Sequence, residues 1–97
     1  MINITTIKVD GKTCMGLRTD LPNSPPLLII AGEKGFLMCG YLNMEGAEKL
    51  EAPAAVVSGV KTFEDVLNGQ VKAATTKAKA LGVEIGMKGL DALKRLA

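Results

Sequence analysis

Two uninterrupted apolar runs near the middle of the chain constrain its fold more than any other feature. Leu27–Ala31 and Phe36–Cys39 are apolar at every position, and Gly32-Glu33-Lys34-Gly35 joins them with glycines that permit a tight connection. Strands that are exposed on one face alternate apolar with polar residues, whereas strands buried on both faces do not. The two runs therefore predict a pair of central strands, buried on both faces.

The N-terminal segment predicts a second hairpin. Asp10-Gly11 suits the two left-handed positions of a type I′ turn, which places strands over residues 2–9 and 12–19. Residues 20–26 then hold three of the four prolines and cannot join a sheet ladder, so they are expected to form a loop.

The register of this hairpin follows from its turn. Counting outward pairs Ile7 with Cys14 on one face of the sheet and Ile4 with Leu17 on the other. The apolar side would therefore switch near Thr5-Thr6, which favours a bulge or a twist at that point. Cys14 is interpreted as a core residue because of its pairing with Ile7.

The second half of the chain predicts helices that alternate with short strands. The expected elements are a helix capped by Asn43 and ended by Pro53, a strand over 54–58, a helix with a Thr62-to-Asp65 capping box that ends at Asn68-Gly69, a helix with the apolar stripe Val71, Ala74, Ala78 and Leu81, a short strand over 83–85, and a final helix from near Met87. Together these elements predict a single α+β domain over residues 1–97. Its N-terminal antiparallel hairpins would form a mixed sheet of about five strands, packed against the C-terminal helices.

The helices of so short a chain would cover only one face of that sheet. Two arrangements would cover the other face. A homo-oligomer would bury it between copies, or the N-terminal hairpin would fold over it as a second layer.

Composition excludes several kinds of site. The chain has no histidine, and its two cysteines, Cys14 and Cys39, lie on separate segments, so zinc sites of the Cys/His type, Ser–His–Asp triads and Cys–His dyads cannot form. No metal and no cofactor is expected. A net charge of +2 with only three aromatic residues lacks the basic patch and stacking rings of a nucleic-acid binder. The N-terminus lacks the pattern of a signal peptide, which favours a cytoplasmic protein with reduced thiols and no membrane association.

The first candidate site is Cys39-Gly40-Tyr41, where a thiol ends an apolar strand and the next glycine allows a ligand to approach the backbone. Cys39 is the only plausible nucleophile of the chain, and Lys34 or Lys61 would have to activate it. The alternative interpretation is structural, because unpaired cysteine is commonly a small buried hydrophobe.

The second candidate site is the turn from Ser58 to Thr62. A strand that passes through Gly59 into a helix presents free N–H groups to an anion, and Lys61 would add a positive charge. The alternative is that Thr62 simply caps a helix and Lys61 is solvated. A lesser candidate of the same kind is Gly86-Met87-Lys88-Gly89, which would otherwise be a flexible loop.

Three functions are compatible with these segments. The leading hypothesis is a small-molecule binding domain that holds an anionic or polar metabolite near Cys39-Gly40-Tyr41 and the turn formed by Gly59, Lys61 and Thr62. One alternative is a thiol-dependent enzyme that uses Cys39. The other is a structural or interaction subunit of a homo-oligomer.

Three segments in order carry a resemblance to a known family. These segments are Gly35–Leu42, Gly59–Leu67, and Gly82-Val83 with Gly86-Met87-Lys88-Gly89 and Ala92-Leu93. Together they resemble the YunC-like family of bacterial and archaeal proteins, a domain of unknown function. The resemblance implies a small cytosolic prokaryotic α+β protein and supplies no activity, cofactor or catalytic residue.

Overall fold

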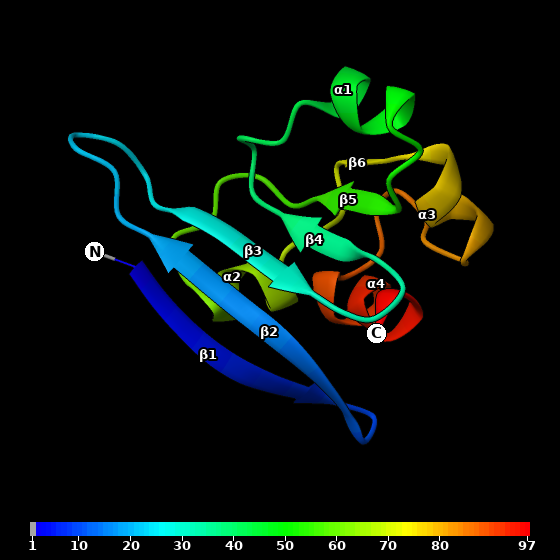
Figure 1. Cartoon of the computed structure of the whole chain (residues 1–97), viewed down its shortest axis with the longest axis horizontal. Helices are drawn as coiled ribbons and strands as arrows, with labels where there is room; N and C mark the ends of the chain where they lie inside the picture. Colours follow the sequence, from blue (N-terminus) through cyan, green and yellow to red (C-terminus); the bar gives the residue numbers. More distant parts are fainter. Residues whose placement is uncertain (1) are drawn as a thin grey trace.

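The computed structural model describes residues 2–97 and shows a six-stranded mixed sheet with helices packed against it (Figure 1). The strands are β1 (Ile2–Val9), β2 (Lys12–Thr19), β3 (Leu27–Ala31), β4 (Phe36–Met38), β5 (Ala54–Val56) and β6 (Ala73–Ala74), and the helices are α1 (Met44–Lys49), α2 (Phe63–Asn68), α3 (Thr76–Ala80) and α4 (Gly89–Leu96). The strands lie in chain order, and all neighbours are antiparallel except β4 and β5. The predicted α+β fold is therefore confirmed, with six strands in place of about five.

The N-terminal hairpin has the predicted turn and register. Asp10-Gly11 has positive φ at both positions, 51° and 78°, as a type I′ turn requires. Ile7 pairs with Cys14 and Ile4 pairs with Leu17, as expected. The expected bulge is absent, because the register is unbroken over the whole of β1 and β2. Both strands curve instead (Figure 1).

The hairpin extends the sheet and does not cover it. Strand β2 pairs with β3 through partners such as Leu17 and Ile29, so both hairpins belong to one continuous layer. The alternative in which the N-terminal hairpin forms a second layer is therefore wrong. The backbone pairing of β2 with β3, from Met15 with Ala31 to Thr19 with Leu27, holds the two hairpins side by side.

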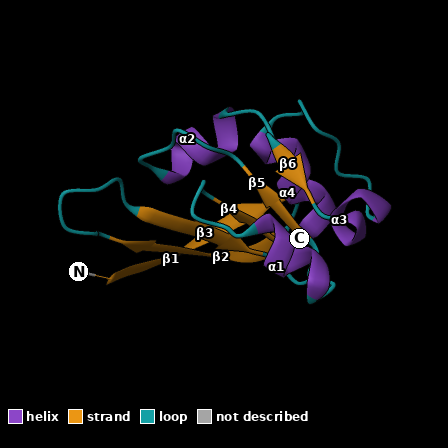
Figure 2. Ribbon diagram, turned by 90° about the horizontal axis from the view of Figure 1, so that it is seen from above, coloured by secondary structure: helices purple, strands orange, loops and turns teal. Residues whose placement is uncertain are grey.

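Only one face of the sheet is fully buried. In β3, Leu28 and Ile30 point to one face and have no exposed surface. The alternate residues Leu27, Ile29 and Ala31 point to the other face and are half-buried. Helices α2 and α4 lie over the side of Leu28 and Ile30 (Figure 2). The prediction that these apolar strands are buried on both faces is wrong for the single chain, because its helices supply only one covering layer.

The segment from Val71 to Leu81 is not the long helix that its apolar stripe predicted. Ala73–Ala74 pairs with β5 as strand β6, and only Thr76–Ala80 is helical. The buried Thr75 between them explains the change. Its hydroxyl donates to the carbonyl oxygen of Ala52 at 2.6 Å, which ties this point of the chain to the sheet. A hydrogen bond to a distant part of the chain therefore outweighs the helical spacing of the apolar residues in this segment.

The predicted short strand over 83–85 does not form, and this segment is irregular up to a turn at residues 85–86. Val83 is buried but Ile85 is 58% exposed, and the backbone N–H of Gly86 donates to the carbonyl of Val71 at 2.8 Å. The helix expected from near Met87 begins slightly later, as α4. Its buried residues Ala92, Leu93 and Leu96 form the apolar side that packs into the core.

Candidate functional site

The two segments singled out in the sequence meet at one cavity. Cys39-Gly40-Tyr41 follows β4, and Gly59-Val60-Lys61 follows β5. Because β4 and β5 are parallel neighbours, their carboxyl ends reach the same edge of the sheet. The cavity between them has a volume of about 400 Å³ and is lined by Pro25, Pro26, Cys39, Gly40, Tyr41, Gly59, Val60 and Lys61.

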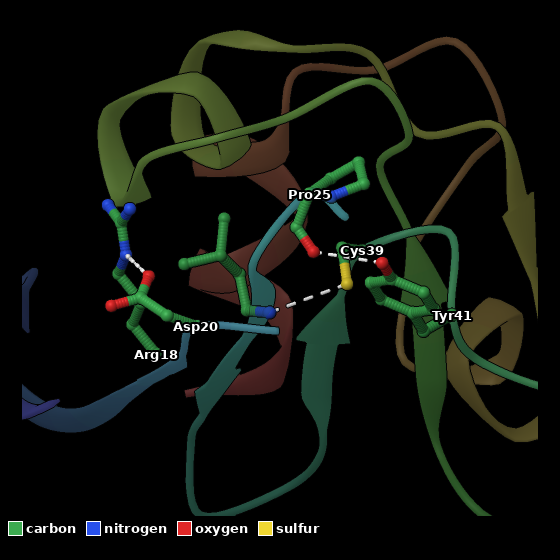
Figure 3. Close-up of polar contacts among 6 residues, drawn as sticks. Arg18, Asp20, Pro25, Cys39 and Tyr41 are labelled. Atoms are coloured by element: carbon green, nitrogen blue, oxygen red, sulfur yellow. Dashed lines mark hydrogen bonds and ion pairs between the residues drawn. The ribbon is translucent and has the colours of Figure 1, made fainter. Parts of the chain in front are cut away.

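The proline-rich loop forms the third wall, which sequence reasoning did not include. Pro25 and Pro26 line the cavity, and the hydroxyl of Tyr41 donates to the carbonyl oxygen of Pro25 at 2.8 Å (Figure 3). This bond joins two segments 16 residues apart. No local pattern predicts such a contact, so the sequence of this segment predicts only a loop.

Cys39 lies in the wall of the cavity with little of its surface accessible. It is 3% exposed, and its Sγ accepts a hydrogen bond from the backbone N–H of Leu28 at 3.4 Å (Figure 3). Its own N–H donates to the carbonyl of Leu28 at 3.1 Å. The thiol is therefore packed against the first residues of β3.

Lys61 supplies the positive charge of the site. Lys61 is an exposed residue that lines the cavity, and no other residue that lines the cavity is charged. Its backbone N–H is already used, because it donates to a carboxylate oxygen of Asp65 at 3.0 Å. Anion attraction at this edge therefore depends on the side-chain ammonium of Lys61.

Thr62 caps α2 and does not line the cavity. Its hydroxyl accepts a hydrogen bond from the N–H of Asp65 at 3.1 Å, and the Asp65 carboxylate in turn accepts from Lys61 N–H. The Thr62 hydroxyl therefore makes the predicted N-cap, but the capping box is not closed, because the Asp65 carboxylate accepts from Lys61 and not from the N–H of Thr62 itself. The N–H groups expected to meet an anion are thus partly satisfied within the protein.

The glycines at the rim have different reasons to be glycine. Gly59 has a φ of +73°, a left-handed conformation that a side chain would strain. Gly40 has ordinary φ, and a Cβ there would lie 3.7 Å from the side chain of Ser58, an ordinary contact. Gly59 is therefore required by the turn, whereas Gly40 lines the cavity at a position where a Cβ could be accommodated.

The lesser candidate, Gly86 to Gly89, lies away from the cavity and is explained by packing. Gly86 has a φ of +95°. At the start of α4, a Cβ on Gly89 would collide with the carbonyl oxygen of Val66 in α2. Gly89 lets the two helices approach closely, and Gly86 adopts a left-handed conformation that favours glycine, so both glycines have a structural reason.

Among residues 2–97, no group of three or more His, Cys, Asp or Glu side chains is placed to hold a metal ion. In the same part of the chain, every helix is too short or too polar to cross a membrane.

Comparison with known proteins assigns the family. The sequence model of a family described as "Domain of unknown function (DUF1805)" matches residues 38–96, which is more than half of the chain. The chain belongs to the DUF1805 family. The matched region contains both strand ends of the cavity and α2, whereas Pro25 and Pro26 precede it.

Two relatives of this DUF1805 chain are similar over nearly its full length. The uncharacterized protein YunC of Bacillus subtilis is 30% identical over 100 residues, which cover 99% of this chain and 98% of that protein. A protein of unknown function from Thermoplasma acidophilum, TA1206, has a crystal structure that superposes with a TM-score of 0.94 at 39% identity, covering 100% of this chain and 94% of that one. The resemblance to the YunC-like family and the α+β fold are both confirmed.

Proposed function

We propose that this DUF1805 domain binds a small metabolite with one anionic group in the cavity between β4 and β5. The observation that carries the proposal is the meeting of two strand ends and the proline-rich loop around a space of about 400 Å³ with one charged side chain, Lys61. Small-molecule sites usually have volumes of about 300–1,000 Å³ and combine apolar walls with a few polar groups. The cavity has both properties.

The wall chemistry defines the ligand class. Pro25, Pro26 and Val60 offer apolar contacts, and the ring of Tyr41 adds an aromatic surface. A carboxylate or phosphate would pair with the Lys61 ammonium at the rim, while an apolar or aromatic body would occupy the interior. We therefore infer a ligand with an apolar body and a single anionic group. We place this binding in the cytoplasm, where the two free thiols of the chain would stay reduced.

A thermal-shift assay with matched compounds tests this function. Benzoate and phenyl phosphate each have a neutral counterpart of similar shape, benzamide and phenyl phosphorodiamidate. A ligand at 100 times its dissociation constant adds about 2.7 kcal/mol to the free energy of unfolding, which is easily measured. The charged member of at least one pair should raise the melting temperature more than its neutral counterpart.

Variants locate the effect. Lys61→Gln should remove the preference for the charged compound, whereas Lys72→Gln, an exposed lysine outside the cavity, should retain it. A preference for anions that survives Lys61→Gln would place binding elsewhere. Equal shifts for charged and neutral compounds would contradict an anionic ligand.

The alternative of a thiol-dependent enzyme rests on the position of Cys39 in the same wall. An electrophilic group bound in the cavity would meet this thiol, but its 3% exposure favours binding without covalent chemistry. Alkylation of Cys14→Ala protein with iodoacetamide reports on Cys39 alone. Labelling much faster than that of free cysteine at neutral pH would favour the enzyme, and slow labelling would argue against it.

A further inference from the structure

One face of the sheet carries apolar side chains that the described chain leaves uncovered. We call it the open face, and it consists of the side chains of β1–β4 that point away from α2 and α4. Within β1 and β2 it includes Ile2, Ile4 and Met15, which are 63%, 65% and 46% exposed. No helix among residues 2–97 lies over this side of β1–β3 (Figure 2). Large exposed apolar patches usually mark an interaction site.

The charged groups on this face are few and lie at one end. Among the described side chains of the open face, the strand residues contribute only Lys8, near the end of β1. At the same end, Glu33 in the β3–β4 connection lines a shallow hollow of about 550 Å³ together with Ile4 and Met15. One positive and one negative charge therefore flank the same end of the face, at opposite sides of the hairpin pair.

We propose that a second copy of this chain covers the open face, related by a twofold axis that runs along the strands between β2 and β3. This axis reverses the order of the strands, so β1 lies over the partner's β4 and β2 lies over the partner's β3. Lys8 then faces the partner's Glu33, and the symmetry repeats the contact. In the same arrangement the apolar side chains of the open face meet those of the partner, with Leu17 opposite the partner's Ile29.

The dimensions of the protein suit this dimer. Sheets that pack face to face lie about 10 Å apart with their strands within about 30° of each other. The protein measures 35 × 32 × 22 Å, so its broad side is large enough to bury about 800 Å² per copy, as stable interfaces do. Dimers with this symmetry are the commonest homo-oligomers.

The helix α1 adds a side wall to the proposed interface. Leu50, at its end, is 82% exposed and borders an apolar hollow that also contains Phe36 of β4. Because the partner's β1 would lie over β4, the edge of that strand would lie beside α1. The dimer would thus protect both an exposed leucine and a long unpaired strand edge.

Light scattering coupled to gel filtration tests the dimer. The wild-type protein should elute with twice the mass of the chain, and the double variant Ile4→Lys/Met15→Lys should elute as a monomer with an unchanged far-UV circular dichroism spectrum. Ile85→Lys is the matched control, since Ile85 is 58% exposed but lies outside the open face, and it should stay dimeric. A monomeric wild type, or a dimer that survives the double variant, would overturn the proposal.

Charge exchange tests the orientation. Lys8→Glu and Glu33→Lys should each weaken the dimer at low salt, because each places like charges opposite one another across the twofold axis. The double variant Lys8→Glu/Glu33→Lys should restore dimerisation toward the wild-type dissociation constant. If the double variant is no tighter than either single variant, the proposed axis is wrong.

Discussion

The side chain of Thr75 links three parts of the chain at a single buried point. It is the buried polar side chain of the core, with none of its surface exposed. Its Oγ1 donates to the carbonyl of Ala52 and accepts hydrogen bonds from the N–H groups of Ala54 at 3.1 Å and Ala78 at 3.3 Å. One hydroxyl therefore aligns β5, ends β6 and caps α3.

Replacing this hydroxyl by a methyl group should be costly. Thr75→Val keeps the shape of the side chain but leaves buried backbone groups without partners, and each such group costs about 1–3 kcal/mol. We expect the free energy of unfolding in urea to fall by about 2–4 kcal/mol. Thr76→Val, at the exposed neighbouring position, should change it by less than about 0.5 kcal/mol. Equal effects at the two positions would contradict this role.

Cys14 gives the protein a specific dependence on pH. Burial raises the pKa of the Cys14 thiol, and the nearby Lys12 offsets this only in part. In the unfolded chain the thiol ionises near its ordinary pKa of about 8.5, while in the folded protein it stays protonated to higher pH. The unfolded state therefore binds fewer protons above that pH, and stability falls as the pH rises from the unfolded pKa to the raised folded pKa.

Chemical unfolding at pH 7, 8, 9 and 10 measures this contribution. Cys14→Ala should be less stable than the wild type at pH 7 because it leaves a small cavity. Its stability should decline less steeply above about pH 8.5, since the thiol that ionises on unfolding is gone. Parallel curves for the two proteins would show that Cys14 does not contribute to the decline.

At the scale of elements, glycine has opposite effects on stability in two helices, α1 and α4. Gly46 lies within α1, where a Cβ would be 3.5 Å from the side chain of Asn43, an ordinary contact. Gly89 begins α4, where a Cβ would meet the backbone of Val66 in α2. The first glycine only weakens its helix, whereas the second allows two helices to pack.

Alanine at these two positions should therefore give changes of opposite sign. Gly46→Ala should raise the free energy of unfolding by about 0.5–1 kcal/mol, because glycine is a poor helix former. Gly89→Ala should lower it by about 1–3 kcal/mol or more, because α2 and α4 must move apart. Thermal unfolding of both variants measures the difference. A Gly89→Ala protein as stable as the wild type would contradict the close packing of these helices.

Local elements were predictable from the sequence wherever neighbouring residues determine them. Asp10-Gly11 fixes the turn and register of the first hairpin, and the N-cap Thr62 fixes the start of α2. Strand β6 was not predictable. Ala74 continues the apolar period of a helix, and the hydrogen bonds of Thr75 that exclude this helix involve residues more than 20 positions away.

At the scale of the whole molecule, the position of the cavity was predictable in part. The strand ends at Cys39 and Gly59 could be expected to meet, because adjacent parallel strands bring their carboxyl ends together. The wall formed by Pro25 and Pro26 depends on the Tyr41 hydrogen bond, which no sequence pattern encodes. That one face of the sheet would stay uncovered was likewise predictable, because so short a chain has few helices. Which charged residues lie on that face could be told only from the strand register of the structure.

The cavity has a built-in reporter. Tyr41 is the single tyrosine of the chain, which has no tryptophan, and its ring lines the cavity. Tyrosine emission therefore reports on this site alone, and a ligand that contacts the ring or breaks its hydrogen bond to Pro25 should change it.

Titration of this emission tests the central claim most directly. Whichever charged compound raises the melting temperature should change Tyr41 fluorescence saturably, with a dissociation constant that rises at least tenfold in Lys61→Gln, equivalent to about 1.4 kcal/mol of binding free energy. The Lys72→Gln protein should bind like the wild type. A compound that stabilises the protein without changing Tyr41 emission, or that binds Lys61→Gln equally well, would contradict an anion site in this cavity.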